Sequence, residues 1–172
     1  GFMREAEIKH GRIAMLAAIA WPLQEILHPA FAGLTGSEDL LVASNGASPS
    51  LINGGLFQIE LLPALALFFC GCSFLEEKDL ANRRDLGLAW NEFPSPSGAF
   101  GRLPGNFGFD PMNFYRPLST ADRVAAQGRE LANGRAAMLA VATYVGVEAV
   151  SGTPIVDVSP YFFEPLIFWP GF

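Results

Sequence analysis

One short charged segment occurs twice in the chain, each time at the start of a long apolar stretch. Residues 7–18 read EIKHGRIAMLAA and residues 130–141 read ELANGRAAMLAV. Each copy has a carboxylate, a His or Asn three residues later, then Gly-Arg and a run of small and apolar residues. Because three residues are nearly one helical turn, the carboxylate and the His or Asn share one helix face. The chain must therefore fold into two similar helices that carry ionisable groups in their first turns.

The composition is that of a membrane protein rather than a soluble one. Hydrophobic residues make up 51% of the 172 residues and charged residues only 16%, whereas a soluble domain usually has about 25% charged residues. The length suits one domain that covers residues 1–172. The net charge of −6 argues against nucleic-acid binding, which requires a basic face. Cys70 and Cys72 are too few for a disulfide framework or a four-ligand metal site.

Three apolar segments have the length needed to cross a bilayer, which is roughly 20 residues of helix. They cover about residues 4–27, 56–75 and 120–150, so the predicted fold is an all-α membrane protein with three transmembrane helices. Residues 119–122, Ser-Thr-Ala-Asp, predict an N-cap for the third helix. The first and third segments begin with charged turns that would be costly in bare lipid, so these charges need partners.

Basic residues predict how the three segments are oriented. All eleven lie at Arg4, Lys9 and Arg12 or between Lys78 and Arg135, and none lies in the first loop or in the tail. By the positive-inside rule, the N-terminus and the second loop share one side of the membrane, and the first loop and the tail share the other. The first and third helices then enter from the same face, so the two copies of the repeat lie at one depth.

At one depth, the repeated charges predict two ion pairs between helices. Within one copy, Arg12 lies about 140° around the helix from Glu7, so the two side chains point apart. A charge near the middle of a membrane costs roughly 2.5–3.5 kcal/mol on insertion scales, and more if it is isolated. The economical arrangement pairs Glu7 with Arg135 and Glu130 with Arg12. The glycine before each arginine allows the two helices to approach closely.

The same segments contain possible metal ligands that are separate from one another rather than clustered. A carboxylate paired with arginine keeps an oxygen lone pair, while His10 and Asn133 add a ring nitrogen and an amide oxygen. A zinc site gathers three or four ligands around one point, whereas single donors suit a metal that already has four equatorial donors. A magnesium tetrapyrrole fits, because Mg²⁺ favours hard oxygen and imidazole donors. From one copy alone, structural ion pairs would be the better interpretation, but repetition of the whole pattern favours ligands.

The two copies resemble the first and third helix signatures of the light-harvesting chlorophyll-binding antenna family. Residues 108–111, Gly-Phe-Asp-Pro, resemble the loop before that family's third helix, and the resemblance covers nearly the whole chain. It implies that the first and third helices are crossed and related by pseudo-two-fold symmetry, with carotenoids beside them. Chlorophyll magnesium, the only metal expected, would have four main ligands: Glu7, His10, Glu130 and Asn133.

Finer features are more similar to the chlorophyll a/c proteins of red-lineage algae, the fucoxanthin-chlorophyll type, than to green chlorophyll a/b proteins. These features are the short loops and the sequences of residues 21–25 and 152–157. The resemblance therefore implies chlorophyll a, chlorophyll c and carotenoids such as fucoxanthin or a related xanthophyll as cofactors.

The chain also departs from the family pattern. Many relatives carry a ligating Gln fourteen residues after the Asn, where this chain has Val147, so that pigment is absent or held by another group. The matching position in the first helix is Gln24, a secondary ligand candidate, and Glu76 best matches the carboxylate ligand of the middle helix. Three weaker candidates, for which a solvated or interfacial position is at least an equal explanation, are Gln58, Glu60 and His28.

Two connecting segments have more aromatic residues than a plain linker. Residues 91–116 are rich in Pro and Gly but contain several Phe residues, whereas disordered linkers are poor in aromatics. We expect this segment to be an ordered loop over the membrane surface or over a bound apolar ligand. The tail at 161–169 resembles an interfacial aromatic belt.

No nucleophile–base arrangement, P-loop or dinucleotide fingerprint occurs, so we do not expect an enzyme. The leading hypothesis is an antenna subunit of the plastid thylakoid membrane that contacts a photosystem core, other antenna subunits and lipids. Its N-terminus and second loop would be stromal, its first loop and tail lumenal, and its start at Gly1 indicates a processed or truncated chain. One alternative is a pigment-free, three-span structural protein. Another is a photoprotective quencher that senses acidity through Glu38, Asp39, Asp157 and Glu164.

Overall fold

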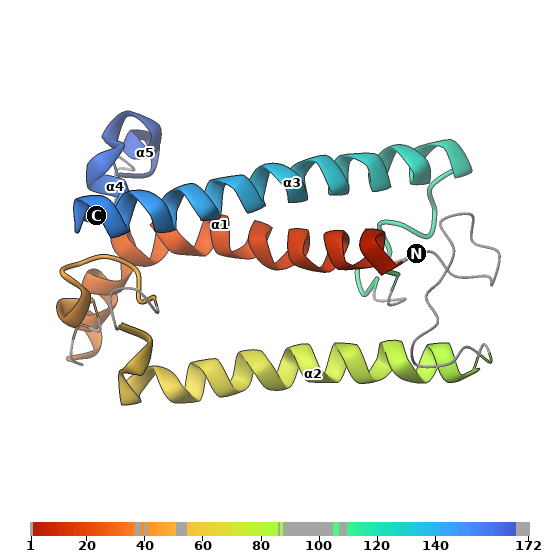
Figure 1. Cartoon of the computed structure of the whole chain (residues 1–172), viewed down its shortest axis with the longest axis horizontal. Coiled ribbons are helices and arrows are strands. Elements are labelled where there is room, and N and C mark those ends of the chain that lie inside the picture. The colour runs from red at the N-terminus through yellow and green to blue at the C-terminus, as the bar shows by residue number, and fades with distance from the viewer. Residues whose placement is uncertain are drawn as a thin grey trace. The chain divides into compact units, whose positions relative to one another are not determined.

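The computed structural model describes residues 2–36, 39, 41–50, 55–85, 87, 105–106 and 110–167 (Figure 1). These residues are mostly helical, as the sequence predicted. The long helices are α1 (Phe2–Thr35), α2 (Leu62–Asp85) and α3 (Thr120–Ser151). Two short helices follow, α4 (Ile155–Val158) and α5 (Pro160–Ile167). Three 3₁₀ turns occupy Val42–Ser44, Gly55–Phe57 and Ile59–Leu61.

Helix α1 is longer than the segment predicted at 4–27. It continues to Thr35 although Pro22 and Pro29 lie inside it, each of which removes one backbone N–H donor. The Thr35 hydroxyl donates to the carbonyl of Phe31 at 2.8 Å, which satisfies an acceptor in the last turn. Gly36 follows with φ of +66°, a conformation that favours glycine and ends helices.

Helix α2 is displaced along the sequence from the predicted segment at 56–75. The 3₁₀ turns hold residues 55–61, and Pro63 lies in the first helical turn, where a missing N–H costs little. At the other end, the charged residues after 75 continue the helix to Asp85. An ion pair between Arg83 and Asp79, one turn apart, supports this extension.

Helix α3 matches the predicted segment at 120–150 closely. The Asp122 backbone N–H donates to the Ser119 hydroxyl oxygen at 3.2 Å, and that hydroxyl donates to the Asp122 carboxylate at 2.7 Å. These two bonds form the predicted N-terminal cap. The helix ends where the Gly152 N–H donates to the carbonyl of Glu148 at 2.8 Å. Within the described ranges, no helix combines enough length with enough apolarity to cross a membrane.

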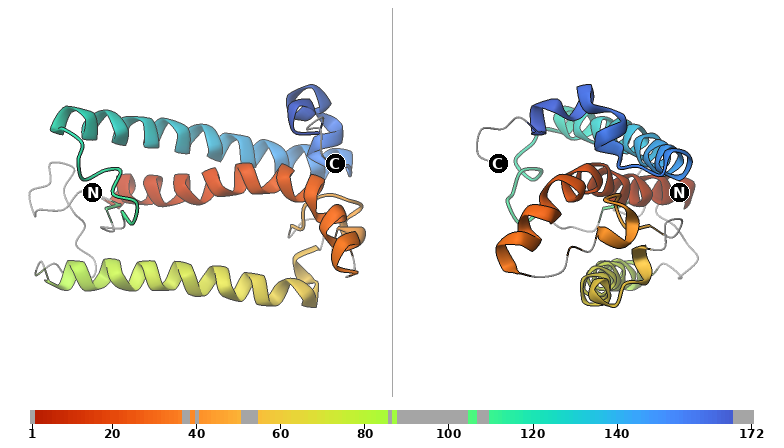
Figure 2. Two further views of the ribbon diagram at one scale, coloured as in Figure 1. Left: turned by 180° about the vertical axis from the view of Figure 1, so that it is seen from behind. Right: turned by 90° about the vertical axis from the view of Figure 1, so that its left-hand side faces the viewer.

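The chain forms two compact units, and the helices α1 and α3 contribute to both. The first unit comprises residues 1–14 and 64–136, and the second comprises residues 15–63 and 137–172. In the first unit, α1 approaches α3 at Gly11 and Gly134, and the two helices diverge towards the start of α3 (Figure 1). In the second unit, α4 and α5 fold back against the later parts of α1 and α3 (Figure 2).

The hydrophobic core of the described residues is small. Its one cluster lies in the second unit, where Ile155, Val156 and Phe163 are buried against partly buried side chains of α1 and α3. Many large apolar side chains on the long helices are instead exposed to a degree unusual for a soluble fold. Examples are Ile13, Leu16, Ile19, Leu67, Phe69, Leu139 and Val150.

Candidate functional site

The two copies of the repeated segment meet at a pair of glycines in the first unit. A Cβ atom built on Gly11 would lie 3.0 Å from the Cα atom of Gly134, and the reverse distance is also 3.0 Å. Such contacts are tighter than nine in ten real Cβ contacts, and the atom opposite is backbone, so an alanine at either position would push the two helices apart by a few tenths of an ångström. The contact sets the carboxylate of each copy opposite the arginine of the other.

The pair between Arg12 and Glu130 is tied to a third element. The Arg12 Nε atom donates to Glu130 Oε1 at 2.7 Å, and its Nη1 atom donates to the Gly105 carbonyl oxygen at 2.6 Å. Gly105 has φ of +73°, and a Cβ there would lie 2.8 Å from Ile8 Cγ2. Glycine is therefore needed at this position both for its backbone conformation and for its close approach to α1. The sequence analysis had not identified this contact.

The second pair, between Arg135 and Glu7, is more open. Arg135 Nε donates to Glu7 Oε1 at 2.6 Å, while Arg4 lies 3.5 Å from the other carboxylate oxygen. The Arg135 side chain is 58% exposed, against 34% for Arg12. Both expected cross-helix pairs are thus present, but they differ in how much protein surrounds them.

His10 is oriented as a ligand through one nitrogen only. Its Nδ1 atom lies 2.8 Å from the carbonyl oxygen of Ala6, and a carbonyl can only accept, so Nδ1 carries the proton. Nε2 of the exposed ring then keeps its lone pair. Asn133 is also exposed. These single, accessible donors beside neutralised carboxylates fit a magnesium tetrapyrrole, whose metal needs one axial ligand.

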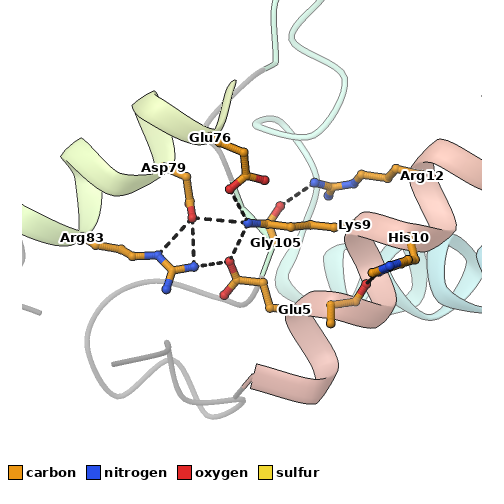
Figure 3. Close-up of polar contacts among 9 residues, drawn as sticks. Glu5, Lys9, His10, Arg12, Glu76, Asp79, Arg83 and Gly105 are labelled. Atoms are coloured by element: carbon orange, nitrogen blue, oxygen red, sulfur yellow. Dashed lines mark hydrogen bonds and ion pairs between the residues drawn. The ribbon is translucent and has the colours of Figure 1, made fainter. Parts of the chain in front are cut away.

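Glu76 belongs to a group of five charged residues that we call the acid–base cluster (Figure 3). Its Oε2 atom accepts from Lys9 Nζ at 2.7 Å. Lys9 also lies 3.2 Å from Glu5, and Arg83 contacts both Glu5 and Asp79. Glu5, Asp79 and Arg83 are buried, whereas the Glu76 side chain is 50% exposed. The sequence analysis singled out Glu76 but missed the cluster, because helix spacing does not show which distant charge a residue meets.

In the second unit, the carboxyl groups of Glu25 and Glu148 are both buried and lie close enough to interact. The Trp21 indole N–H donates to Glu148 Oε1 at 2.6 Å, and the Ser48 and Val156 backbone N–H groups donate to Glu25, each at 3.2 Å. Glu25 and Glu148 lie beyond the two repeated segments but are related by the same offset along the sequence as Glu7 and Glu130.

Gln24 and Val147 directly precede Glu25 and Glu148 in the sequence, and these equivalent positions of α1 and α3 carry different residues. Gln24 is half-buried, and Val147 packs against the apolar cluster of the second unit. Valine therefore has a packing role at the position where relatives carry a ligand.

The weaker candidates are placed as follows. His28 Nδ1 lies 2.9 Å from Asp39 Oδ1, and Gln58 is half-buried. The side chain of Glu60 lies outside the described residues. In the second unit's tail, Tyr161 is exposed.

Asp110 organises the part of the long loop that precedes α3. Its carboxylate accepts backbone N–H bonds from Phe114, Tyr115 and Arg116 at 2.9, 3.0 and 3.1 Å. Desolvation alone would raise the pKa of Asp110, but these bonds and the nearby Arg116 charge lower it below its usual value. The other parts of the predicted loop, residues 91–104 and 107–109, lie outside the described residues.

Comparison with known proteins identifies the family. The model of the chlorophyll a-b binding proteins matches residues 1–148 and 95–165. The chain belongs to the chlorophyll a-b binding protein family. This confirms the resemblance found in the sequence. No solved structure matches the chain.

Two kinds of chloroplastic protein are among the relatives that are similar to this chain. A fucoxanthin-chlorophyll a-c binding protein of Isochrysis galbana is 29% identical over 150 residues, which are 87% of this chain and 64% of the relative. Light-harvesting complex stress-related protein 1 of Chlamydomonas reinhardtii is 31% identical over 166 residues, which are 90% of this chain and 56% of the relative. Both relatives are described as chloroplastic. The chain thus spans less than two thirds of their length.

Proposed function

We propose that this chain is an antenna subunit that binds chlorophylls and carotenoids and passes excitation energy to a photosystem. The observation that carries the proposal is the reciprocal pairing of Glu7 with Arg135 and of Glu130 with Arg12, in a chain of the chlorophyll a-b binding family. Chlorophyll supplies the light absorption when it is bound. The residues of the chain fix where each pigment is held.

The ion pairs suit carboxylates to this task. An isolated carboxylate in apolar surroundings would take up a proton, whereas one paired with a guanidinium stays charged and keeps oxygen lone pairs for magnesium. We assign the main ligands to Glu7, His10, Glu130 and Asn133. The additional candidates are Gln24 and Glu76.

The small core of the protein supports the same function. Leu16, Ile19 and Leu139 are each more than half exposed on long helices, and exposed apolar area of this kind is unfavourable in water. Carotenoids and chlorophyll tails would cover these side chains.

We further propose that the three long helices cross the thylakoid membrane, with the first and third related by pseudo-two-fold symmetry. The distribution of basic residues favours a stromal N-terminus and second loop and a lumenal first loop and tail. The similarity to fucoxanthin-chlorophyll a-c binding proteins supports chlorophyll a, chlorophyll c and a fucoxanthin-like carotenoid. The partners would be a photosystem core, other antenna subunits and thylakoid lipids.

Pigment extraction from the purified wild-type chain and two variants tests the proposal. Glu130→Ala should lose chlorophyll and thermal stability together, because it removes a ligand and also removes the carboxylate that pairs with the Arg12 guanidinium. Glu130→Gln keeps a neutral oxygen donor and should retain more pigment than Glu130→Ala. A stable but colourless wild-type protein, as expected of a pigment-free structural protein, would refute the proposal. A Glu130→Ala variant with a full pigment complement would refute the ligand assignment.

A second candidate function is photoprotective quenching, which the 31% identity to a stress-related light-harvesting protein favours. Among the proposed acid sensors, Asp39 is bonded to His28 and Asp157 is exposed. Glu38 and the side chain of Glu164 lie outside the described residues. Chlorophyll fluorescence lifetimes of the isolated protein should shorten at low pH if it senses acidity. Lifetimes that are independent of pH would exclude this function.

A further inference from the structure

The acid–base cluster holds one carboxylate that is unlike the other two. Glu5 and Asp79 have side chains only 2% and 1% exposed, and both contact the buried Arg83 guanidinium. Glu76 is half exposed and lies at the outer edge of the cluster (Figure 3). Of the three acids, only Glu76 can therefore reach a ligand outside the cluster.

Of the three acids of the cluster, Glu76 lies nearest to Lys9. Lys9 Nζ lies 2.7 Å from Glu76 Oε2, against 3.2 Å from Glu5 and 3.7 Å from Asp79. Glu5 and Asp79 also have Arg83 as a partner. The pairing of Lys9 with Glu76 joins α1 to α2, so the cation comes from a different helix than the carboxylate.

The cluster contains three acids and two bases. The magnesium of a chlorophyll is a Lewis acid that can accept a lone pair from the accessible Glu76 carboxylate. Because the pigment is neutral overall, its binding would not change the net charge of the cluster. The bond to Lys9 uses Oε2, and a carboxylate has a second oxygen that can bind a metal.

We propose that Lys9 is a positioning residue that holds the Glu76 carboxylate, across two helices, to bind the magnesium of a chlorophyll. This inference rests on the proposed antenna function. The Lys9–Glu76 pair would then be a third ion pair that holds a ligating carboxylate, in addition to the two glutamate–arginine pairs. Without Lys9, the half-exposed Glu76 carboxylate would turn towards water and lose its orientation.

A mutant cycle on the pigmented full chain tests this role, with chlorophyll per polypeptide as the readout. Lys9→Met, which removes the charge at similar length, should lose one chlorophyll per chain. Glu76→Met should lose the same chlorophyll, recognised by the same missing red absorption band. The double variant Lys9→Met/Glu76→Gln should regain it, because a neutral amide oxygen can bind magnesium without a counter-charge.

Several results would overturn the proposal. They are a full pigment complement in Lys9→Met or in Glu76→Met, different missing bands in these two variants, and a double variant that loses as much pigment as Lys9→Met. The last result would mean that Lys9 only supports the fold. These outcomes are distinct from failure of the antenna function, in which the wild-type chain itself would be colourless.

A second variant keeps the test decisive if Lys9→Met does not fold. Lys9→Arg preserves the charge but moves it relative to the Glu76 carboxylate. We expect it to retain the pigment and to shift the red absorption band of that one chlorophyll. An unchanged absorption spectrum in a folded Lys9→Arg protein would contradict a positioning role.

Discussion

The two cross-helix ion pairs should differ in their contribution to stability, although the sequence makes them look equivalent. Arg12 is bonded to Glu130 and to the Gly105 carbonyl, whereas Arg135 is more exposed and pairs with Glu7. A hydrogen bond to a charged group contributes about 1.5–3 kcal/mol, and a largely exposed ion pair adds little. We therefore expect Arg12→Gln to lower the free energy of unfolding by about 2 kcal/mol.

For a chain of this size, that loss corresponds to a decrease in Tm of about 4–8 °C. Arg135→Gln is the matched control and should lower Tm by clearly less. The assay is thermal unfolding of the pigmented proteins in one detergent, followed by circular dichroism, with chlorophyll content measured so that pigment loss is separated from loss of the ion pair. Equal decreases for the two variants, or a larger decrease for Arg135→Gln, would refute the reasoning from burial and from the Gly105 contact.

Three further predictions concern other contacts. Gly134→Ala should force the crossing helices apart and destabilise the protein by about 1–3 kcal/mol, whereas Gly146→Ala, which has open space around it, should be neutral or stabilising; equal Tm values would contradict the close approach. Glu148→Leu should destabilise by about 1–3 kcal/mol because it leaves the partly buried Trp21 indole N–H unpaired, while Glu148→Gln can still accept that bond, so the idea fails if both variants unfold at the same temperature. Because its pKa is depressed, Asp110 should stabilise its loop at neutral pH and lose this contribution only below its ordinary pKa of 3.8; NMR shifts of the three capped amides that change near pH 6 would argue against it.

The sequence predicted the contacts that depend on repetition. Helical period and the one-sided distribution of basic residues bring Glu7, Arg12, Glu130 and Arg135 to one depth, and the glycine in each copy permits the approach. The geometry of a regular helix is enough to predict these contacts, so individual residue pairs could be named from the sequence.

Contacts that depend on the path of a loop or on a third helix were beyond such arguments. The bond from Arg12 to Gly105 depends on the loop before α3 returning to α1. The bond from Lys9 to Glu76 depends on which face of α2 is turned towards α1. The ends of α1 and α2 were also misplaced. The predicted segments ended near residues 27 and 75, whereas the helices continue to Thr35 and Asp85. Local contacts within these extensions, from Thr35 to Phe31 and from Arg83 to Asp79, support the additional turns.

The contact between Gly11 and Gly134 also has a consequence for the optical properties of an antenna. Two backbones that touch without intervening side chains cannot move closer, and the flanking ion pairs oppose their separation. The distance between pigments on opposite helices would then be set by main-chain atoms rather than by adaptable side chains. Coupling between transition dipoles falls steeply with distance. Because the distance would be fixed, the coupling would be nearly the same in every molecule. If the chain is an antenna subunit, the absence of a side chain at Gly11 and Gly134 would thus make energy transfer reproducible from one molecule to the next.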